Sequence, residues 1–576
     1  MKSYRVRDGA PQEVRAALGN HSEFMQDLFY LRGITDQDAA SAFLYPDFER
    51  DSHDPMLLPD MEKAGDRILG ALKANEKVSV WSDYDCDGIP GGVMLSDFLR
   101  KIGLSVRHYI PHRHKEGYGL NMQGVDELAE EGITLIITID LGTTEHEAIT
   151  YAKSKGIDVI VTDHHLVYAD EAGKQDLPRD AYAVINPKRL DSKYPFDGLC
   201  GAGVAWKLVQ RILQKNRFNL PDGAEKWYLD LVGIATLSDM VPLVGENRML
   251  ASFGLVVLRK NRRPGLAQLL SLVRIKPHTL TEDDIGFMIG PRINAASRMD
   301  SPDVAAKLLG SHDLGEALQL AQKLNGINDE RKSLVAVTVK EANKRLQNVE
   351  EGMESPIIVM GNPNWRPGIL GLVANSLMQA SGKPVFLWGR DYGSTPEEQE
   401  GLLRGSCRSN GKVNVVELMQ AAGDIFDHFG GHAASGGFSV SEGRVHELGP
   451  RLAAAFAKLP LQAPVEEVLV DRNLDMADVL RAHKELKALA PFGVGNTKPL
   501  FLLSNMSIRS VRTFGKGKDH LEVTCERDNT SIAGVSFFST PDSYQRRIKS
   551  GDTADVVGHV ETDWKGQPRL RIVDVL

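Results

Sequence analysis

The stretch Val-Ser-Val-Trp-Ser-Asp-Tyr-Asp-Cys-Asp-Gly-Ile-Pro-Gly-Gly, residues 78–92, places three aspartates directly after a short apolar run. The carboxylates of Asp83, Asp85 and Asp87 repel one another, and burying them at the end of a strand is costly unless a cation neutralises them. A hard divalent ion with oxygen ligands is the usual solution. The stretch therefore predicts half of a metal site, and an exposed acidic turn is the alternative.

A similar aspartate spacing occurs in calcium loops. Those loops require a glutamate six residues after the glycine, where its carboxylate completes the coordination of the ion. That position holds Met94, which offers no oxygen ligand. A calcium loop of this type is therefore excluded.

Around this stretch, short β-branched runs alternate with helical patterns. The alternating segments are 78–81, 91–102, 104–110, 125–131, 133–139, 145–155 and 157–162. Such alternation is typical of βαβ units and of a parallel sheet. We therefore predict an α/β domain whose strands are parallel.

Ionisable residues follow two later strands of this predicted sheet. Asp140 ends the run Thr-Leu-Ile-Ile-Thr-Ile-Asp, and Asp163-His164-His165 ends Asp-Val-Ile-Val-Thr-Asp-His-His. Because the carboxyl ends of strands in an open α/β sheet line one crevice, we expect these side chains to lie near the three aspartates. A capping or turn role would explain any one segment alone, but the convergence of three segments favours a metal site. Asp239 lies at the end of a helical pattern that a proline terminates, and it is a further candidate ligand.

Length and composition bound the class of protein. A chain of 576 residues is long enough for about two to four domains. The net charge of −9 arises from 68 basic and 77 acidic residues, so any phosphate-binding surface must be local. The four cysteines contain no Cys-x-x-Cys pair, which argues against a disulfide framework and a zinc ribbon. Without a long apolar run or the apolar core of a signal peptide, we expect a cytoplasmic protein with no membrane segment.

Further motifs, in a fixed order along the chain, indicate a family. They are Asp-Tyr-Asp-Cys-Asp-Gly (83–88), Asp140, Asp-His-His (163–165), Cys-Gly-Ala-Gly-Val-Ala (200–205), Ser-Asp (238–239), Gly-Pro-Arg-Ile-Asn-Ala-Ala (290–296), Trp-Arg-Pro-Gly-Ile (365–369) and Gly-Gly-His-Ala-Ala-Ser-Gly-Gly-Phe (430–438). The series resembles the DHH phosphoesterase superfamily and its RecJ branch, the single-strand-specific 5′→3′ DNA exonucleases. The last motif resembles that of the associated DHHA1 domain. The resemblance runs from about residue 55 to the C-terminus.

The patterns and the resemblance together predict the domain order. We expect an α/β fold with a parallel-sheet DHH catalytic domain at 55–310, a long connecting helix at 311–350 and a second α/β domain, DHHA1, at 351–460. Residues 1–54 show helical patterning without a readable motif, so we predict a helical lead-in. Residues 461–576 carry short strand patterns, which predict a closed β-barrel, and in RecJ-like proteins this segment is an oligonucleotide-binding barrel.

Two segments in the second half of the chain can be explained by a structural role alone. An apolar stripe at helical spacing predicts that the connecting helix is simply packed against its neighbours. The stripe consists of Leu334, Val335, Thr338, Ala342 and Leu346. The glycine-rich stretch 430–437 suits a close approach to phosphate, and a glycine-rich hairpin is the alternative.

Aromatic and basic side chains in the predicted barrel also have two interpretations. The aromatic candidates are Phe514, Phe537, Phe538 and Trp564, and the basic ones are Lys516, Lys518, Arg546, Arg547 and Lys565. They supply stacking faces and charges for a single strand of nucleic acid, or most of the aromatics form the barrel core. The sequence leaves both interpretations open.

For the metal site, the resemblance implies two divalent ions, which in such enzymes lie about 3.5–4 Å apart. The expected ligands are Asp85 and Asp140 for one ion, and Asp87, Asp140, His164 and Asp239 for the other, with Asp140 bridging. Asp83 is expected to be a ligand or to support one, and His165 to face the scissile phosphate. An imidazole ligand shifts the preference from magnesium toward manganese, so we expect Mn²⁺, with Mg²⁺ also supporting activity.

The resemblance also assigns residues to the substrate. The family's pocket for the 5′-phosphate is matched by Arg113, Ser406 and Arg408, and a guanidinium suits this task because it pairs bidentately with phosphate oxygens. Further contacts to the strand are expected from Arg292, Asn294 and His432. At first sight His108, His112 and His114 resemble a metal cluster, although a basic loop at a strand end is the favoured interpretation.

These expectations describe a manganese-dependent exonuclease that degrades single-stranded DNA from its 5′ end and releases 5′-mononucleotides in repair and recombination. The resemblance further implies a single-strand-binding protein and a helicase as partners, and we expect a monomer. An alternative is an oligoribonucleotide or cyclic-dinucleotide phosphodiesterase, or a pyrophosphatase, which the β-rich C-terminal domain disfavours because a small substrate needs no groove that follows a strand. A non-catalytic replication scaffold predicts eroded ligands, whereas every ligand position is filled here.

Overall fold

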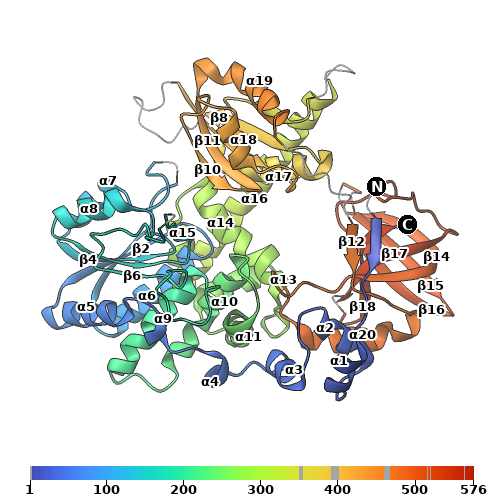
Figure 1. The fold of residues 1–576 in the computed structure, drawn as a ribbon, viewed down its shortest axis with the longest axis horizontal. Coiled ribbons are helices and arrows are strands. Elements are labelled where there is room, and N and C mark those ends of the chain that lie inside the picture. Colours follow the sequence, from blue (N-terminus) through green and yellow to red (C-terminus); the bar gives the residue numbers. More distant parts are fainter. Residues whose placement is uncertain are drawn as a thin grey trace. The chain divides into compact units, whose positions relative to one another are not determined.

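The computed structural model of the chain describes residues 3–113, 115–170, 172–348, 355–390, 401–459, 467–515, 517–518, 520–563 and 565–576. The chain forms two compact units, whose elements are labelled in Figure 1. Unit 1 comprises Met1–Ser52, Pro242–Ser252 and Pro464–Leu576, and unit 2 comprises His53–Val241 and Phe253–Ala463. The chain therefore leaves unit 1 after residue 52 and returns to it twice.

The first part of unit 2 contains a five-stranded sheet. Its strands are β2 (Lys77–Ser82), β3 (Ser105–Tyr109), β4 (Ile133–Ile139), β5 (Asp158–Thr162) and β6 (Ala183–Ile185). They lie in the order β3-β2-β4-β5-β6, and every neighbouring pair is parallel. The predicted parallel-sheet α/β domain is thereby confirmed.

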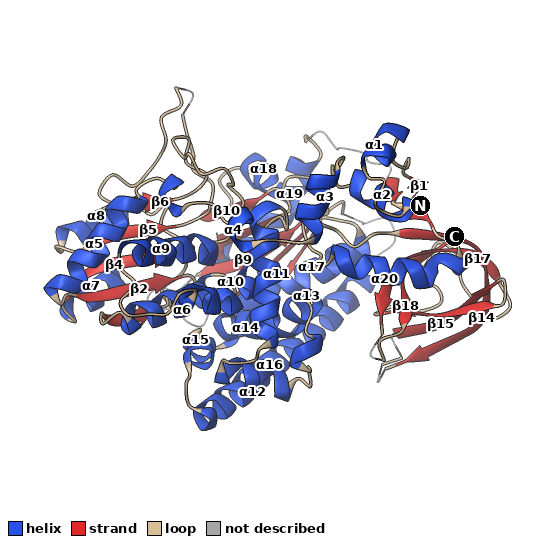
Figure 2. Ribbon diagram, turned by 90° about the horizontal axis from the view of Figure 1, so that it is seen from below, coloured by secondary structure: helices blue, strands red, loops and turns tan. Residues whose placement is uncertain are grey.

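Helices cover this sheet, as Figure 2 shows. The helices α7 (Met122–Glu130) and α8 (His146–Ser154) share one apolar cluster with side chains from β2, β4 and β5. The helices α6 (Gly88–Lys101) and α9 (Gly201–Lys215) pack against each other, and α6 packs on β2 and β3. A central strand of such a sheet is buried on both faces, which explains why β4 is an almost continuous apolar run.

A helical segment precedes and follows the sheet. The main helices of unit 2 outside the sheets are α5 (Met61–Ala74), α10 (Leu229–Ser238), α12 (Pro264–Leu272), α14 (Gly290–Met299), α15 (Asp303–Gly310) and the long α16 (Leu314–Gln347), and the chain passes from unit 1 to unit 2 within α11 (Gly245–Arg259). On α16, Leu334, Ala342 and Leu346 pack with an apolar cluster that contains Trp365, so the predicted packed connecting helix is confirmed. Among the described helices, none combines the length and the apolar character needed to cross a membrane.

The second α/β part of unit 2 holds a mixed sheet. Its strands are β7 (Ile358–Gly361), β8 (Val385–Arg390), β9 (Leu402–Arg408), β10 (His428–His432) and β11 (Ser435–Ser441), and its helices are α17 (Pro367–Ser381), α18 (Val415–Ala421) and α19 (Val445–Phe456). The strand order is β10-β11-β9-β8-β7, in which β7 and β8 are parallel and the other neighbours are antiparallel.

The glycine-rich stretch 430–437 forms the hairpin of β10 and β11. Gly431 has a φ of 141°, and a Cβ at this position would lie 2.4 Å from the carbonyl oxygen of Ser435. The close approach of the two strands therefore requires glycine here. The hairpin interpretation of this stretch is correct.

Unit 1 contains the predicted closed barrel. Its strands are β14 (Phe501–Phe514), β15 (His520–Arg527), β16 (Thr530–Ser536), β17 (Thr553–Thr562) and β18 (Pro568–Val575). They lie in the order β14-β15-β16-β18-β17, and a pairing between β14 and β17 closes the barrel. Strand β14 continues through an irregular register between Leu503 and Met506.

The N-terminal helices contribute to the core of this barrel. The helices α1 (Gln12–Ala17) and α2 (Glu23–Tyr30), together with α20 (Val479–Leu489), place buried side chains in one apolar cluster with the barrel strands. Within the cluster, the rings of Phe24 and Phe501 stack with their centroids 5.8 Å apart. The segment predicted as a lead-in thus shares a hydrophobic core with residues more than 400 positions later in the chain.

The N-terminal segment also pairs with the second half of unit 1 through its backbone. Strand β1 (Ser3–Val6) pairs in parallel with β12 (Glu467–Val470). The hydroxyl of Tyr4 donates a hydrogen bond to Asp574 Oδ2 at 2.8 Å. The two ends of the chain are therefore held within one unit.

Three aromatic residues predicted for the barrel lie on its surface. Phe537 is 38% exposed, Phe538 is 83% exposed and Phe514 is half-buried. Their ring centroids lie 5.5, 5.0 and 5.2 Å, respectively, from that of His520. None of the three belongs to the apolar cluster of the barrel, so the core interpretation is wrong for them. Trp564 and Lys516 lie outside the described residues.

The shared core predicts that truncation of an N-terminal side chain destabilises the barrel unit. Phe29 on α2 is fully buried in the cluster that contains the barrel strands, so Phe29→Ala should lower the free energy of unfolding of unit 1 by about 3–5 kcal/mol. Differential scanning calorimetry of the full chain measures the effect. Tyr45→Ala, at a side chain that is 71% exposed, is the control and should leave the transition unchanged. An unshifted transition in Phe29→Ala would show that the helices and the barrel unfold independently.

Candidate metal centre

Three strand ends and two helix ends bring the predicted metal ligands together. Asp83 follows β2, Asp140 follows β4 and Asp163 follows β5, so all three lie at the carboxyl edge of the parallel sheet. Asp87 directly precedes α6, and Asp239 caps the C-terminal end of α10. The fold therefore gathers at one edge the side chains that the sequence distributes over separate segments.

Asp140 leaves its strand through an unusual backbone conformation. Its φ is 63°, in the left-handed region, which costs about 1–2 kcal/mol for a residue with a Cβ. Its backbone N–H donates to the carbonyl oxygen of Thr162 at 3.0 Å, which holds it to the neighbouring strand. The turn brings its carboxylate within 3.0 Å of the His164 ring. Strain of this kind is typical of functional sites.

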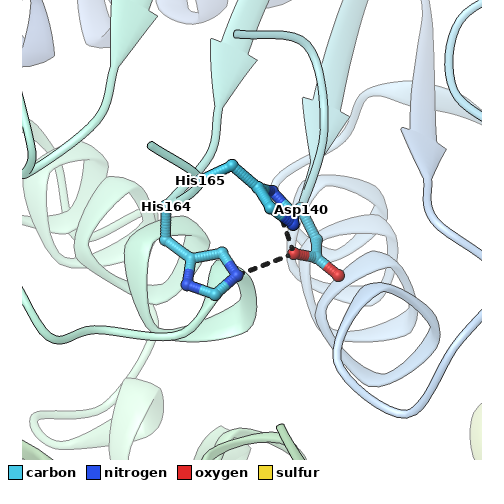
Figure 3. A group of neighbouring side chains, drawn as sticks. All are labelled: Asp140, His164 and His165. Carbon is cyan, nitrogen blue, oxygen red and sulfur yellow. Dashed lines mark ion pairs between the residues drawn. The ribbon is translucent and has the colours of Figure 1, made fainter. Parts of the chain in front are cut away.

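The candidate ligands form three overlapping groups, in each of which the ligand atoms lie within 4.8 Å of one another. The groups are Asp87, His164 and Asp239; Asp83, Asp85 and Asp140; and Asp140, His164 and His165. Figure 3 shows the last group, in which dashed lines join both imidazole rings to the Asp140 carboxylate, at 3.0 Å from His164 Nε2 and 3.9 Å from His165 Nδ1. The structure thus brings together all the residues expected at the metal site, and it places Asp83 beside Asp85 and Asp140.

His164 lies at the middle of the first group. Its Nε2 atom is 3.0 Å from Asp140 Oδ1, 3.6 Å from Asp239 Oδ2 and 3.7 Å from Asp87 Oδ2. Although the first distance is short, Asp140 Oδ1 is buried and has no hydrogen-bond partner. Asp83 Oδ1 is likewise buried without a partner. Ligand atoms that converge without bonding one another fit a shared cation.

Burial and mutual repulsion perturb the ionisation of these groups. Burial and the neighbouring Asp85 raise the pKa of Asp87 to about 7, and burial with Asp87 raises the pKa of Asp239 to about 8. Burial is also the main cause that raises the pKa of Asp140. Burial lowers the pKa of His164 to about 4, so its imidazole is neutral at pH 7. A neutral imidazole beside carboxylates that lack a countercharge is the combination that a divalent ion binds best.

The N-terminus of α9 holds Asp87 in place. The backbone N–H groups of Gly201 and Ala202 donate to its carboxylate oxygens at 2.6 and 2.7 Å. Amides in the first turn of a helix have no partner within the helix and favour a negative group. A Cβ on Gly201 would lie 2.5 Å from Asp140 Cβ and 2.8 Å from Asp140 Cα. Glycine at this position therefore allows α9 to approach both aspartates.

Asp163 orients the two histidines. Its Oδ1 accepts a hydrogen bond from the backbone N–H of His164 at 2.7 Å and lies 2.8 Å from His165 Nδ1, and its Oδ2 accepts from the N–H of Thr143 at 2.9 Å. Burial alone would raise the pKa of Asp163, but these bonds hold it well below its usual range. Burial likewise opposes the charge on His165, yet the bond to Asp163 outweighs it and raises the pKa to about 9. The ring of His165 is thus fixed while 45% of its side chain stays exposed.

The residues predicted to bind the 5′-phosphate come from two parts of unit 2. Arg113 lies in the loop after β3, with its guanidinium 5.0 Å from the centroid of the Tyr84 ring. Ser406 and Arg408 lie two residues apart on β9 and so share one face of the strand. Arg408 donates to the carbonyl oxygen of Cys407 at 2.7 Å. Burial lowers the pKa of Arg408, and the charge of Arg113 lowers it further, so the two guanidinium groups are near each other.

The other predicted substrate contacts are dispersed. Arg292 and Asn294 lie on α14, where Arg292 donates to Asn325 Oδ1 at 3.0 Å and to the carbonyl oxygen of Met288 at 2.6 Å. Asn294 Oδ1 is buried without a hydrogen-bond partner. His432 ends the exposed strand β10. The structure places His432 on a different element from the α14 pair, and no hydrogen bond or ion pair joins them in the described part of the chain.

The two described histidines on β3 and in the loop after it belong to no group of potential metal ligands. His108 lies on β3 with its Nε2 atom 3.0 Å from Ser82 Oγ, and burial lowers its pKa to about 3. Within the ranges that the structure describes, no group of potential metal ligands contains His108 or His112. His114 lies outside the described residues.

Two hydrogen-bonding supports of the centre, Asp163 and the amides at the start of α9, are not predicted in that role from the sequence. Asp163 precedes two candidate ligands directly, and a carboxylate in that position is a signal for a residue that orients a ligand imidazole. The amides of Gly201 and Ala202 leave a weaker signal, a run of small residues where a helix begins. Both supports act by hydrogen bonds to candidate ligands, which sequence spacing does not reveal.

The approach of α9 predicts that Gly201→Ala weakens metal binding. The added Cβ would push α9 away from Asp140 and pull the amide donors away from Asp87, so the affinity for Mn²⁺ should fall by about 10–100-fold, as measured by isothermal titration calorimetry. Gly203→Ala on the same helix is the matched control, because its Cβ would meet no atom closer than 3.6 Å. Equal affinities in the two variants would contradict the proposed support of Asp87.

The raised carboxylate pKa values predict that metal binding depends on pH. Asp87 and Asp239, with pKa values of about 7 and about 8, are mostly protonated at pH 6 and must lose these protons before an ion binds. Because their folded pKa values exceed the unfolded ones, they destabilise the metal-free fold increasingly as pH rises toward 8. Mn²⁺ should therefore raise the melting temperature more at pH 8 than at pH 6, relative to EDTA. A larger stabilisation at pH 6 would contradict this assignment of charge.

Known protein families match three segments of the chain. Residues 77–236 match the DHH family, N-terminal domain, residues 354–458 match the DHHA1 domain, and residues 470–574 match the RecJ OB domain. The first two segments hold the two sheets of unit 2, and the third holds the barrel of unit 1.

Individual relatives extend this similarity over almost the whole chain. The chain is 34% identical over 554 residues to the single-stranded-DNA-specific exonuclease RecJ of Bacillus subtilis, covering 95% of this chain and 67% of that protein. It is 30% identical over 541 residues to the protein of the same name from Escherichia coli, covering 90% of each. The crystal structure of RecJ in complex with Mn²⁺ from Thermus thermophilus matches with a TM-score of 0.79 and 28% identity, covering 100% of this chain and 79% of that one. With its ordered motifs, its three matched domains and these relatives, the chain belongs to the RecJ family of DHH phosphoesterases.

Proposed function

We propose that this protein is a metal-dependent exonuclease that hydrolyses single-stranded DNA from its 5′ end. The observation that carries the proposal is the set of overlapping aspartate and histidine groups at one edge of the sheet, in the same unit as the neighbouring Arg113 and Arg408. The relatives named as single-stranded-DNA-specific exonucleases support the choice of substrate.

The proposed ligand sets follow the grouping of the side chains. One ion is assigned to Asp85 and Asp140 with Asp83 beside them, and the other to Asp87, His164, Asp239 and the shared Asp140. Carboxylates combined with one imidazole favour Mn²⁺ and admit Mg²⁺. RecJ structures from Thermus thermophilus in complex with each of these ions support this choice.

The residues around the ions have separate tasks in hydrolysis. Bound at these residues, two divalent ions would lower the pKa of an attacking water and offset the charge that develops on the phosphate. His165, with a pKa raised to about 9, carries a proton at neutral pH and would donate a hydrogen bond to the scissile phosphate. Asp163 holds the ring in that orientation. The amides of α9 hold the Asp87 carboxylate in the ligand position.

We propose that digestion proceeds from the 5′ end because the protein binds the terminal 5′-phosphate of the strand. Arg113, Ser406 and Arg408 would bind the 5′-phosphate, since guanidinium groups pair bidentately with phosphate oxygens and a hydroxyl adds a further donor. A captured terminal phosphate presents the first internal phosphodiester to the metal edge. The product is therefore a 5′-mononucleotide. Arg292, Asn294 and His432 are proposed as further contacts to the strand.

The remaining parts of the chain are assigned to substrate capture and partners. We keep the predicted limits of 55–310 for the catalytic domain and 461–576 for the barrel domain, and the exposed Phe537 and Phe538 support stacking of bases on the barrel. A free single strand arises when a helicase opens a duplex, and a single-strand-binding protein covers it. We therefore propose that the protein acts as a monomer in the cytoplasm with partners of these two kinds, in DNA repair and recombination.

An assay with end-labelled single strands tests the proposed function. Purified full-length chain should release mononucleotides from the 5′ end in Mn²⁺ and none in EDTA. Asp140→Ala removes the shared carboxylate and should lower the rate by about a thousandfold or more, while far-UV circular dichroism shows that the fold is retained. Arg408→Ala should reduce the preference for a 5′-phosphate over a 5′-hydroxyl. Turnover without metal, digestion from the 3′ end or full activity of Asp140→Ala would overturn the proposal.

A further inference from the structure

Arginine side chains from four separate elements of unit 2 gather beside the predicted 5′-phosphate pocket. Arg298 of α14 is half-buried, and burial together with the charges of Arg113, Arg331 and Arg408 lowers its pKa to about 10. It donates to the carbonyl oxygen of Gly368, which lies in the first turn of α17, at 3.2 Å. Arg331 belongs to the connecting helix α16, for which the sequence pattern predicts a packing role alone.

The positive charge continues along α14 and α16. Burial lowers the pKa of Arg331, and the charge of Arg292 lowers it further. The pKa of Lys332, the next residue on α16, is lowered in the same way by burial, Arg292 and Arg331. We call Arg292, Arg298, Arg331 and Lys332 the basic ridge.

Carboxylates do not balance the basic ridge. Asp329 lies near Arg292 and Lys332 and accepts a hydrogen bond from Asn325 Nδ2 at 3.0 Å. Glu330, the other acidic residue of this turn, is paired with Arg366 at 3.2 Å. In the described part of the chain, neither Arg331 nor Lys332 forms an ion pair. The charges of Arg331 and Lys332, held close to other cations, favour the binding of an anion.

Buried polar atoms without partners lie on the same two helices. They are Arg331 Nε, Asn294 Oδ1 and both amide atoms of Asn328. The helices α14 and α16 pack against each other, and Arg292 on one bonds to Asn325 on the other at 3.0 Å. Buried polar groups are normally satisfied, so this interface has unused hydrogen-bonding capacity beside unbalanced charge.

The terminal phosphate alone does not account for so many cations. A phosphate monoester carries about 1.5 to 2 negative charges at neutral pH, which Arg113 and Arg408 already match. The basic ridge on α14 and α16 adds more positive charge than the terminal phosphate can balance. Phosphodiesters, with one charge each along the same strand, are the anions that would match the remaining positive charge.

We propose that Arg331 and Lys332 bind internucleotide phosphates of the single strand, so that α16 is a substrate-binding element as well as a connector. This inference rests on the proposed exonuclease function, because it assigns residues to the same substrate. The ridge adds affinity for any strand, whatever its base sequence or its 5′ end. Its loss should therefore reduce the dependence of binding on salt.

Fluorescence anisotropy of a 3′-labelled oligothymidine strand tests the assignment. Binding to the full chain is measured against KCl concentration in EDTA, which prevents cleavage, with 5′-phosphate and 5′-hydroxyl strands. Arg331→Met and Lys332→Met should each reduce the slope of log K against log salt by about 0.7 and weaken binding on the order of fivefold for both strands. Lys340→Met, at an exposed lysine on the same helix, is the matched control and should keep the wild-type slope.

Each outcome decides the assignment. Lys332 is exposed, so its substitution leaves the fold intact even if Arg331→Met lowers the melting temperature. Unchanged slopes in both variants, or losses equal to that of Lys340→Met, would overturn the inference. A loss confined to 5′-phosphorylated strands would place the residues in the terminal pocket and also overturn it. If wild-type protein fails to degrade single strands in Mn²⁺, the proposed function is wrong. The salt dependence measured in EDTA would still test whether Arg331 and Lys332 bind phosphates.

Discussion

Repulsion among carboxylates at the carboxyl edge of one parallel sheet is the constraint around which unit 2 is built. Asp83, Asp87 and Asp140 are almost fully buried, and their pKa values are raised because water does not stabilise their charge. The surrounding structure holds this arrangement without removing the repulsion. The amides of α9 bind one carboxylate, and the left-handed turn at Asp140 aims another at His164. Divalent cations are the partners that complete such a centre.

The same physical rule operates with the opposite sign among the arginines at the predicted 5′-phosphate pocket. Burial lowers the pKa of Arg298 on α14, and guanidinium groups from the loop after β3, from α16 and from β9 lower it further. A substrate that carries phosphates would relieve this repulsion, and bound cations would relieve that of the carboxylates. Unit 2 therefore holds a cluster of carboxylates that suits metal ions and a cluster of arginines that suits phosphates. This combination fits metal-dependent hydrolysis of a phosphate backbone.

Unit 1 meets a different requirement, because a small barrel has little interior of its own. The N-terminal helices and α20 enlarge its hydrophobic core, and aromatic contacts such as that of Phe24 with Phe501 join the segments. Apolar side chains from outside the barrel thus stabilise it. Phe537 and Phe538 are consequently not needed in the core, and they stay on the surface with His520. A stable barrel that keeps exposed aromatic rings suits stacking with unpaired bases.

The sequence by itself determined the fold class, the parallel sheet and the residue types of the metal centre. The apolar run of β4, the stripe on α16 and the aspartates after β2, β4 and β5 are local patterns, and local backbone geometry converts them directly into strands, helices and strand ends. Only the tertiary structure decided that Asp83 joins Asp85 and Asp140, that α9 holds Asp87, that the N-terminal helices share the barrel core and that Arg331 lies beside Arg298. Each of these depends on contacts between residues distant along the chain, and chain periodicity does not encode which distant surfaces will meet.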